Sequence, residues 1–440
     1  MFASPLLDAP LIAGLLPTTI SAAGSAGAVF LLARSGRVWW TRSVPVALAV
    51  GVALAAVAEL VVMVVRPFPD LLPLRMLAWI AVAATGTALA WAHRRAAVWR
   101  RVVAVVALLA VVATCGVKAN SFYGYRPTLA TALGLPAHDE IVLSTLPHIM
   151  PLVVAPPGVP LARVWHVPPG MPRTGRIAHA YIPGRRSHFP TRAAWLYLPP
   201  AYLGSRRAQL PVLVLVPGQP GGPDDWLLAG RLAAVVDAFA AAHDGLAPVV
   251  VVPDVTGSPF GNPLCLDSRL GAAETYLADD VPAWVATHLQ VAPGPLAIGG
   301  FSFGGTCALQ LAVRRPEVYP TFLDISGQSE PSLGDHAQTV QATYDGDEDA
   351  FRRVDPLDEL AHRRFPRSAG LLAVGRDDPD FRPQAEQVAA AAQAAGMTVT
   401  LDELPGGHSW SMAADELGRA LPWIGVRTGL LVPAGPPPPS

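Results

Sequence analysis

One serine of the chain stands where it could act as a nucleophile. Ser302 is the centre of the pentapeptide GFSFG at residues 300–304, which directly follows the apolar run 296–298. A serine on a tight strand-to-helix turn leaves room only for glycine two residues before it and two residues after it. Residues 306–313 have apolar positions at helical spacing and supply the helix after the turn. The pattern predicts an exposed hydroxyl that can accept an acyl group.

A histidine near the end of the chain is the candidate general base. His408 lies in the glycine-rich segment PGGHSW, which follows the strand-like run 398–404. Such a loop can bring the imidazole back over Ser302. There it would take the hydroxyl proton during attack on an ester carbonyl and return it to the leaving alcohol. We interpret the other ten histidines as solvated or structural.

The acid of the triad is expected between the serine and the histidine in the chain. The strand-like run 371–374 leads into three candidates, Asp377, Asp378 and Asp380. We choose Asp378 and keep the other two as reserves. The chosen carboxylate would fix the tautomer of the imidazole and stabilise the imidazolium.

The negative charge of a tetrahedral intermediate needs two backbone N–H donors. Phe303 follows the nucleophile and is expected to supply one. The second is expected from the loop PGQPGG at residues 217–222, which follows the strand-like run 211–216. Gln219 is the candidate because Pro217 and Pro220 have no N–H.

Strand-like runs alternate with helical patterns in the second half of the chain, which predicts an α/β fold with a mostly parallel sheet. Further runs lie at residues 195–198, 249–252 and 321–325. We divide the chain into a membrane region (1–118), a connector rich in Pro and Gly (119–175), a catalytic domain (176–430) and a disordered proline-rich tail (431–440).

Several of these motifs in this order resemble one family of serine hydrolases. They are a strand ending in LPPAY at 194–202, the loop with DDW at 224–226, the GFSFG turn, and PGGH near the end. The chain is similar to the esterase family of esterase D-like enzymes, feruloyl esterases and actinobacterial mycolyltransferases. This resemblance implies an α/β-hydrolase fold with Ser302, Asp378 and His408 as the triad. Pro217 departs from the family pattern, which has histidine there, and we interpret Glu274 as structural.

The front of the chain is much more apolar than the rest. The whole sequence is 52% hydrophobic and 15% charged, which is too apolar for an ordinary soluble protein. About 20 apolar residues cross a bilayer, so four runs predict four transmembrane helices. These runs are residues 11–33, 43–65, 76–92 and 102–117. A cleaved signal peptide is rejected because residues 1–10 carry no Lys or Arg and three more spans follow.

The arginines of the loops predict an orientation. Three lie in the first loop, two in the second and four in the third: Arg34, Arg37, Arg42, Arg66, Arg75, Arg94, Arg95, Arg100 and Arg101. Loops rich in Arg stay in the cytoplasm, so the residues after Lys118 are expected outside the cell. Glu59 lies within the second span, and we interpret it as a packing residue whose role stays open.

The sequence gives no sign of a cofactor or of nucleic acid as a partner. A formal net charge of −1 offers no basic footprint, and we find no P-loop, dinucleotide fingerprint or metal-ligand spacing. We therefore expect no metal and no organic cofactor. Cys115 lies in the fourth span and is interpreted as a packing residue. Outside the cell Cys265 and Cys307 could be paired or free, and the sequence leaves both open.

Together these observations predict an integral membrane protein with an extracytoplasmic serine esterase domain. Its partners would be the lipid bilayer and a carboxylic ester, and the tether suggests an ester of an envelope lipid or glycan. One alternative is an acyltransferase similar to the mycolyltransferases, in which a sugar or lipid hydroxyl replaces water. Another is a non-catalytic, membrane-tethered binding module.

Overall fold

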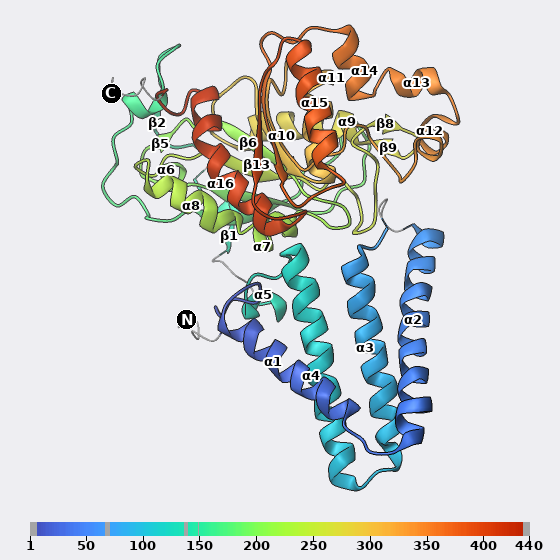
Figure 1. The fold of residues 1–440 in the computed structure, drawn as a ribbon. Helices are drawn as coiled ribbons and strands as arrows, with labels where there is room; N and C mark the ends of the chain where they lie inside the picture. Colours follow the sequence, from blue (N-terminus) through green and yellow to red (C-terminus); the bar gives the residue numbers. More distant parts are fainter. Residues whose placement is uncertain (1–6, 67–70, 136–139, 148, 434–440) are drawn as a thin grey trace, which may run out of the picture. The chain divides into compact units, whose positions relative to one another are not determined.

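The computed structural model describes residues 7–66, 71–135, 140–147 and 149–433 (Figure 1). Within the chain, contacts define two compact units, Met1–Ala137 and His138–Ser440. We call them the N-terminal unit and the C-terminal unit. The predicted proline-rich tail falls mostly on residues 434–440, which lie outside the described residues.

The N-terminal unit is built from long apolar helices. Its helices are α1 (Leu15–Leu32), α2 (Val44–Val65), α3 (Leu74–Ala92), α4 (Val98–Tyr123) and the short α5 (Leu129–Ala132). Among the described residues, four helical segments are long and apolar enough to cross a membrane: Leu15–Leu32, Trp39–Val65, Leu74–Arg95 and Val98–Tyr123. The four predicted spans therefore coincide with four real helices.

Glycine lets these helices approach closely. A methyl group at Gly27 of α1 would lie 2.7 Å from the carbonyl oxygen of Ala107 in α4. A methyl group at Gly51 of α2 would lie 2.5 Å from the carbonyl oxygen of Ala81 in α3. Close backbone contact through small residues is the usual packing of helices in lipid.

Glu59 lies near the connection between α2 and α3. Its carboxylate accepts a hydrogen bond from the backbone N–H of Leu72 at 3.3 Å. The carboxylate thus has a partner just before α3, which agrees with a packing role.

The C-terminal unit contains a nine-stranded sheet with the order β1-β3-β4-β7-β6-β10-β11-β12-β13. The strands are β1 (Glu140–Val142), β3 (Arg176–Ala180), β4 (Ala194–Leu198), β6 (Val212–Val216), β7 (Val249–Val252), β10 (Ala297–Phe301), β11 (Thr321–Ile325), β12 (Ala369–Gly375) and β13 (Thr398–Leu404). Strand β4 is antiparallel to both of its neighbours, and the remaining pairs are parallel. The predicted mostly parallel α/β sheet is confirmed.

The central strands are buried on both faces. Strands β6 and β7 read VLVLV and VVVV, and every residue in them is buried. Continuous aliphatic runs of this kind are typical of parallel strands covered by helices on both sides. At the edge of the sheet the structure differs from the sequence division, because β1 lies within the predicted connector and pairs with β3. Three residues are too few to show a strand pattern.

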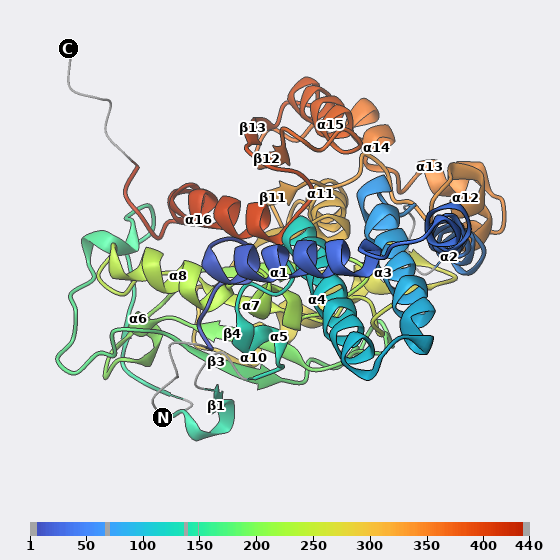
Figure 2. The same cartoon turned by 60° about the horizontal axis from the view of Figure 1, so that its bottom comes forward.

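Helices and short strand pairs complete this unit (Figures 1 and 2). The helices are α6 (Pro200–Leu203), α7 (Asp224–Leu228), α8 (Leu232–Ala241), α9 (Ala273–Thr275), α10 (Val281–His288), α11 (Phe303–Arg314), α12 (His336–Tyr344), α13 (Glu348–Arg352), α14 (Pro356–His362), α15 (Arg382–Ala394) and α16 (Trp410–Arg427). The short strands are β2 (Leu152–Val153) with β5 (Arg207–Ala208), and β8 (Asp267–Ser268) with β9 (Gly271–Ala272). Helix α8 packs on α16, and α14 packs on both α11 and α15.

Candidate active site

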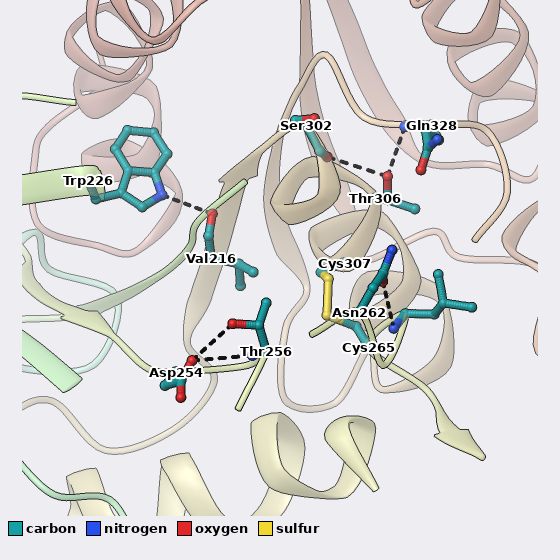
Figure 3. Close-up of a disulfide and its surroundings, with 11 residues drawn as sticks. Val216, Trp226, Asp254, Thr256, Asn262, Cys265, Ser302, Thr306, Cys307 and Gln328 are labelled. Carbon is teal, nitrogen blue, oxygen red and sulfur yellow. Dashed lines mark hydrogen bonds between the residues drawn. A yellow bond between two sulfur atoms is a disulfide. The ribbon is translucent and has the colours of Figure 1, made fainter. Parts of the chain in front are cut away.

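Ser302 occupies a sharp turn between β10 and α11, at the end of a central strand (Figure 3). Its backbone is left-handed, with φ 58° and ψ −121°. Its N–H donates to the carbonyl oxygen of Ile325 on the neighbouring strand at 2.8 Å. A non-glycine residue in this conformation is strained, and such strain is characteristic of nucleophile turns.

The two glycines of the pentapeptide are required by close contacts. A methyl group at Gly300 would lie 2.2 Å from the backbone of Gly304, and one at Gly304 would lie 2.1 Å from the carbonyl oxygen of Val216. Both distances are far shorter than van der Waals contact, so no side chain fits at either position. The spacing seen in the sequence is therefore a packing requirement of the turn.

The structure brings His408 and Asp378 together. His408 Nδ1 lies 3.0 Å from Asp378 Oδ2. Asp378 is 4% exposed, whereas Asp377 and Asp380 are exposed. Of the three acids after β12, Asp378 is therefore the one that meets the histidine.

The two loops that carry this pair are bonded to each other. The N–H of Arg376 donates to Leu404 and the N–H of Asp377 donates to Gly406, at 2.8 and 2.9 Å. A methyl group at Gly375 would lie 2.4 Å from the carbonyl oxygen of Gly406. Glycine at the end of β12 thus allows the loop after β13 to come close enough for His408 to reach Asp378.

Aromatic rings place the imidazole beside the serine turn. The His408 ring lies 4.8 Å from the ring of Phe301 and 4.2 Å from that of Phe381, measured between centroids. Phe301 directly precedes Ser302, so the histidine is held against the residue next to the nucleophile. Phe381 did not stand out in the sequence, because an apolar residue before a helix carries no signal of its own.

One predicted oxyanion residue adjoins the serine, and the residue before the other lies near it. Phe303 begins α11 directly after Ser302. Gly218 of the loop after β6 passes close by, because a methyl group there would lie 3.7 Å from Ser302 Cβ. Gln219 follows Gly218, and its side-chain amide donates to the carbonyl oxygen of Phe260 at 3.3 Å.

Asp324 packs against the residues that follow the Ser302 turn. This buried residue of β11 accepts a hydrogen bond from the N–H of Gly327 at 2.8 Å. Its carboxylate packs against Gly305, where a methyl group would lie 2.3 Å from Oδ1. Burial raises the pKa of Asp324 to about 7, and the Gly327 hydrogen bond opposes this shift. The sequence analysis did not single this residue out.

A disulfide joins the start of α11 to a distant loop. Cys265 and Cys307 are bonded; they are 42 positions apart in the sequence, and their Cα atoms are 5.5 Å apart. Figure 3 shows this bond below the Ser302 turn. Of the two possibilities that the sequence left open, the structure contains the paired one.

Comparison with known proteins gives the same assignment of fold. Residues 191–424 match the model of the family described as "Putative esterase". An uncharacterised protein of Corynebacterium glutamicum is 42% identical over 255 residues, which are 56% of this chain and 60% of that protein. A diacylglycerol acyltransferase/mycolyltransferase of Mycobacterium avium is 38% identical over 61 residues, 14% of this chain and 17% of that protein. The chain thus spans less than two thirds of either relative.

Two solved structures resemble the C-terminal unit. A ferulic acid esterase aligns with a TM-score of 0.50 and 18% identity, over 58% of this chain and 99% of that one. An S-formylglutathione hydrolase from Agrobacterium tumefaciens aligns with the same TM-score and identity, over 58% of this chain and 97% of that one. At this identity the likeness establishes the α/β-hydrolase fold. Because the family model covers more than half of the sequence, the chain belongs to this esterase family.

Proposed function

We propose that this protein is a membrane-anchored serine hydrolase that cleaves carboxylic esters through an acyl-serine intermediate at Ser302. The observation that carries the proposal is the contact between His408 and the buried Asp378, beside the strained serine turn. A nucleophile, a base and an orienting acid in this arrangement are the minimum set for acyl transfer.

The proposed mechanism follows from the geometry. With Nδ1 bonded to Asp378, the proton of the neutral His408 is assigned to Nδ1, which leaves Nε2 as the base for the Ser302 hydroxyl. Attack on the ester carbonyl makes His408 an imidazolium, which the buried carboxylate stabilises. The backbone N–H groups of Phe303 and Gln219 would receive the oxyanion. His408 then protonates the leaving alcohol, and water attacks the acyl-serine by the same route.

The N-terminal unit is proposed to be the anchor. Its long helices expose many apolar side chains, as a lipid-facing surface does. The distribution of arginine among the loops supports an orientation with the C-terminal unit outside the cell. The disulfide between Cys265 and Cys307 supports that side, because disulfides persist in oxidising compartments. The substrate we propose is an acyl ester of an envelope lipid or glycan.

Acyl transfer is the second candidate. It is favoured by the likeness to a diacylglycerol acyltransferase/mycolyltransferase, which covers a short part of both chains. Hydrolysis and transfer differ only in whether water or another hydroxyl accepts the acyl group. Analysis of the products formed from an activated ester with and without added sugar or glycerol distinguishes them.

Labelling with a fluorophosphonate tests the nucleophile. The full chain in detergent should be labelled, and Ser302→Ala should abolish labelling and lower hydrolysis of p-nitrophenyl butyrate by about 10³-fold or more. Ser326→Ala is the matched control, because this buried serine follows the neighbouring strand and is also left-handed, with φ 49°. Folded wild-type protein without labelling would favour the binding module instead.

Protease treatment of intact cells tests the orientation. A tag added after Ser440 should be removed from outside while a cytoplasmic marker survives. Protection of the tag in intact cells and its loss after lysis would place the C-terminal unit inside.

A further inference from the structure

A partly buried ion pair lies next to the loop that carries Gln219. Asp254 follows β7 and is fully buried, and Arg192 precedes β4. Arg192 Nε donates to Asp254 Oδ2 at 2.9 Å and Nη2 donates to Oδ1 at 2.8 Å. The backbone N–H of Arg192 also donates to Oδ2, at 2.7 Å. Burial would raise the pKa of Asp254, but the hydrogen bonds and charge of Arg192 outweigh it and hold the pKa below its usual value.

The same guanidinium reaches the loop at residues 217–222, which we call the oxyanion loop. Arg192 Nη2 donates to the carbonyl oxygen of Gly221 at 3.1 Å and to Thr256 Oγ1 at 2.8 Å. Gly222 packs directly on the guanidinium, because a methyl group there would lie 2.8 Å from Nη2. Asp254 and Thr256 are bonded to each other, as Figure 3 shows. One side chain thus connects a buried carboxylate to two residues of the loop.

Both ends of the oxyanion loop are fixed by other groups. Trp226 Nε1 donates to the carbonyl oxygen of Val216 at 2.8 Å, just before the loop. The N–H of Gly222 donates to Asp225 at 2.9 Å, at the end of the loop. In the proposed mechanism the N–H of Gln219, between these points, has to point at the position of the oxyanion. Arg192 acts on the carbonyl two residues later, where a change in the backbone would rotate that N–H away.

We propose that Arg192, held by Asp254, is a positioning residue for the oxyanion hole. It fixes Gly221 and Gly222 and thereby the N–H of Gln219. This inference rests on the proposed function. Oxyanion stabilisation depends on donors that are aligned before the reaction, so a small shift of the loop lowers the rate more than it weakens substrate binding. Lysine cannot replace the planar fork that bonds a carboxylate, a hydroxyl and a carbonyl together.

The test compares two similar ion pairs. Arg314 and Glu274 are also partly buried, with Nε and Oε2 2.6 Å apart, and Arg314 also donates to a backbone carbonyl, that of Arg353. This pair joins α11 to α9 and does not contact the oxyanion loop in the described contacts. Arg192→Lys and Asp254→Asn are therefore matched by Arg314→Lys and Glu274→Gln. The measurements are kcat and KM for p-nitrophenyl butyrate, binding of a trifluoromethyl ketone, and hydrogen exchange of residues 217–222.

We expect Arg192→Lys and Asp254→Asn to lower kcat about 10- to 100-fold with little change in KM. Affinity for the trifluoromethyl ketone, which forms a tetrahedral adduct, should fall in proportion, and the oxyanion loop should exchange faster. The two control variants, Arg314→Lys and Glu274→Gln, should have a kcat near the wild-type value. Thr256→Val removes one acceptor of Arg192 and keeps the ion pair. It serves as a second variant if the others fail to fold, and it should lower kcat by a smaller factor.

Two outcomes would overturn the inference. One is a wild-type kcat with unchanged exchange of residues 217–222 in the Arg192→Lys protein. The other is an equal loss of kcat in both pairs, which would indicate general destabilisation. A wild-type protein no more active than Ser302→Ala would instead refute the proposed function, and hydrogen exchange would still decide whether Arg192 holds the loop.

Discussion

Helices α2 and α11 are both apolar, yet they differ in how much of their surface they bury. In α2 the buried positions are Val44, Ala47, Gly51 and Ala55, and large side chains such as Leu60 are exposed. In α11 every residue from Phe303 to Val313 is buried. A helix of a water-soluble domain hides its large apolar side chains, whereas α2 hides its small ones. Composition alone does not separate the two; the contacts do.

This difference is the one expected between a helix that contacts lipid and a helix inside a water-soluble domain. Small residues let α2 approach α3 closely, and the large side chains that remain outside need an apolar environment, which a bilayer provides. Helix α11 instead lies against β10, β11 and β6, where the sheet supplies that environment. The two helices therefore differ as expected if the N-terminal unit is the proposed membrane anchor and the C-terminal unit a soluble domain.

The largest expected effect concerns chemistry, which we assign to the C-terminal unit alone. Asp378→Asn should lower kcat about 10³- to 10⁴-fold, because His408 loses the carboxylate that fixes its tautomer. Asp377→Asn and Asp380→Asn, at exposed positions, are the controls and should change kcat little. Steady-state kinetics in detergent measure this, and extraction from membranes should be equal for all three. A comparable loss in either control would reassign the acid.

A smaller effect distinguishes the two environments directly. Leu309→Ala in α11 should cost about 2 to 5 kcal/mol, because it leaves a cavity in a packed core. Leu60→Ala in α2 should cost under about 1 kcal/mol, since an exposed lipid-facing side chain fills no cavity. Thermal inactivation of the full chain in lipid nanodiscs compares them. Equal losses would show that Leu60 packs against protein.

The smallest effect depends on pH. Glu416 of α16 is fully buried, and neither of its oxygens has a hydrogen-bond partner among the described residues. Burial, helped by the charge of Asp402, raises its pKa to about 7 from an ordinary 4.5. The pKa of Glu416 is higher in the folded than in the unfolded protein. Its contribution to the free energy of unfolding is therefore fully present below pH 4.5 and is lost as the pH rises through 7.

In Glu416→Gln the side chain stays neutral at every pH, so the variant should not lose stability as the pH rises. Relative to wild type it should gain on the order of 1 to 3 kcal/mol at pH 8, and the gain should shrink as the pH falls towards 4.5. Melting temperatures at both pH values measure it. Glu386→Gln, at an exposed position of α15, is the control and should show no such dependence. A gain in stability that is the same at both pH values would contradict a raised pKa of Glu416.

Much of the fold could be predicted because its signals are local. Predicted strands at residues 249–252 and 321–325 have the same bounds as β7 and β11. Long apolar runs gave the four helices, and the glycines around Ser302 gave the turn. The edge strand β1 was missed because its pairing with β3 is a tertiary contact.

The candidate site was only partly predictable, because its polar contacts join distant segments. Asp254 follows a buried run of four valines, and an acid at the end of such a strand was a signal that could have been used. Arg192 had no comparable signal, since nothing near it in the sequence distinguishes it from the other arginines. Its partners lie 29 to 64 residues away.

The sequence by itself determined the tight turn at Ser302 and the four apolar helices, since both depend on residues adjacent in the chain. Only the tertiary structure decided which of three neighbouring acids meets His408, that Cys265 and Cys307 pair, and that Arg192 bonds to the carbonyl oxygen of Gly221. Each of these depends on the distance between groups from separate loops. That distance is set by how the sheet and its helices pack, and the order of residues along the chain does not specify it.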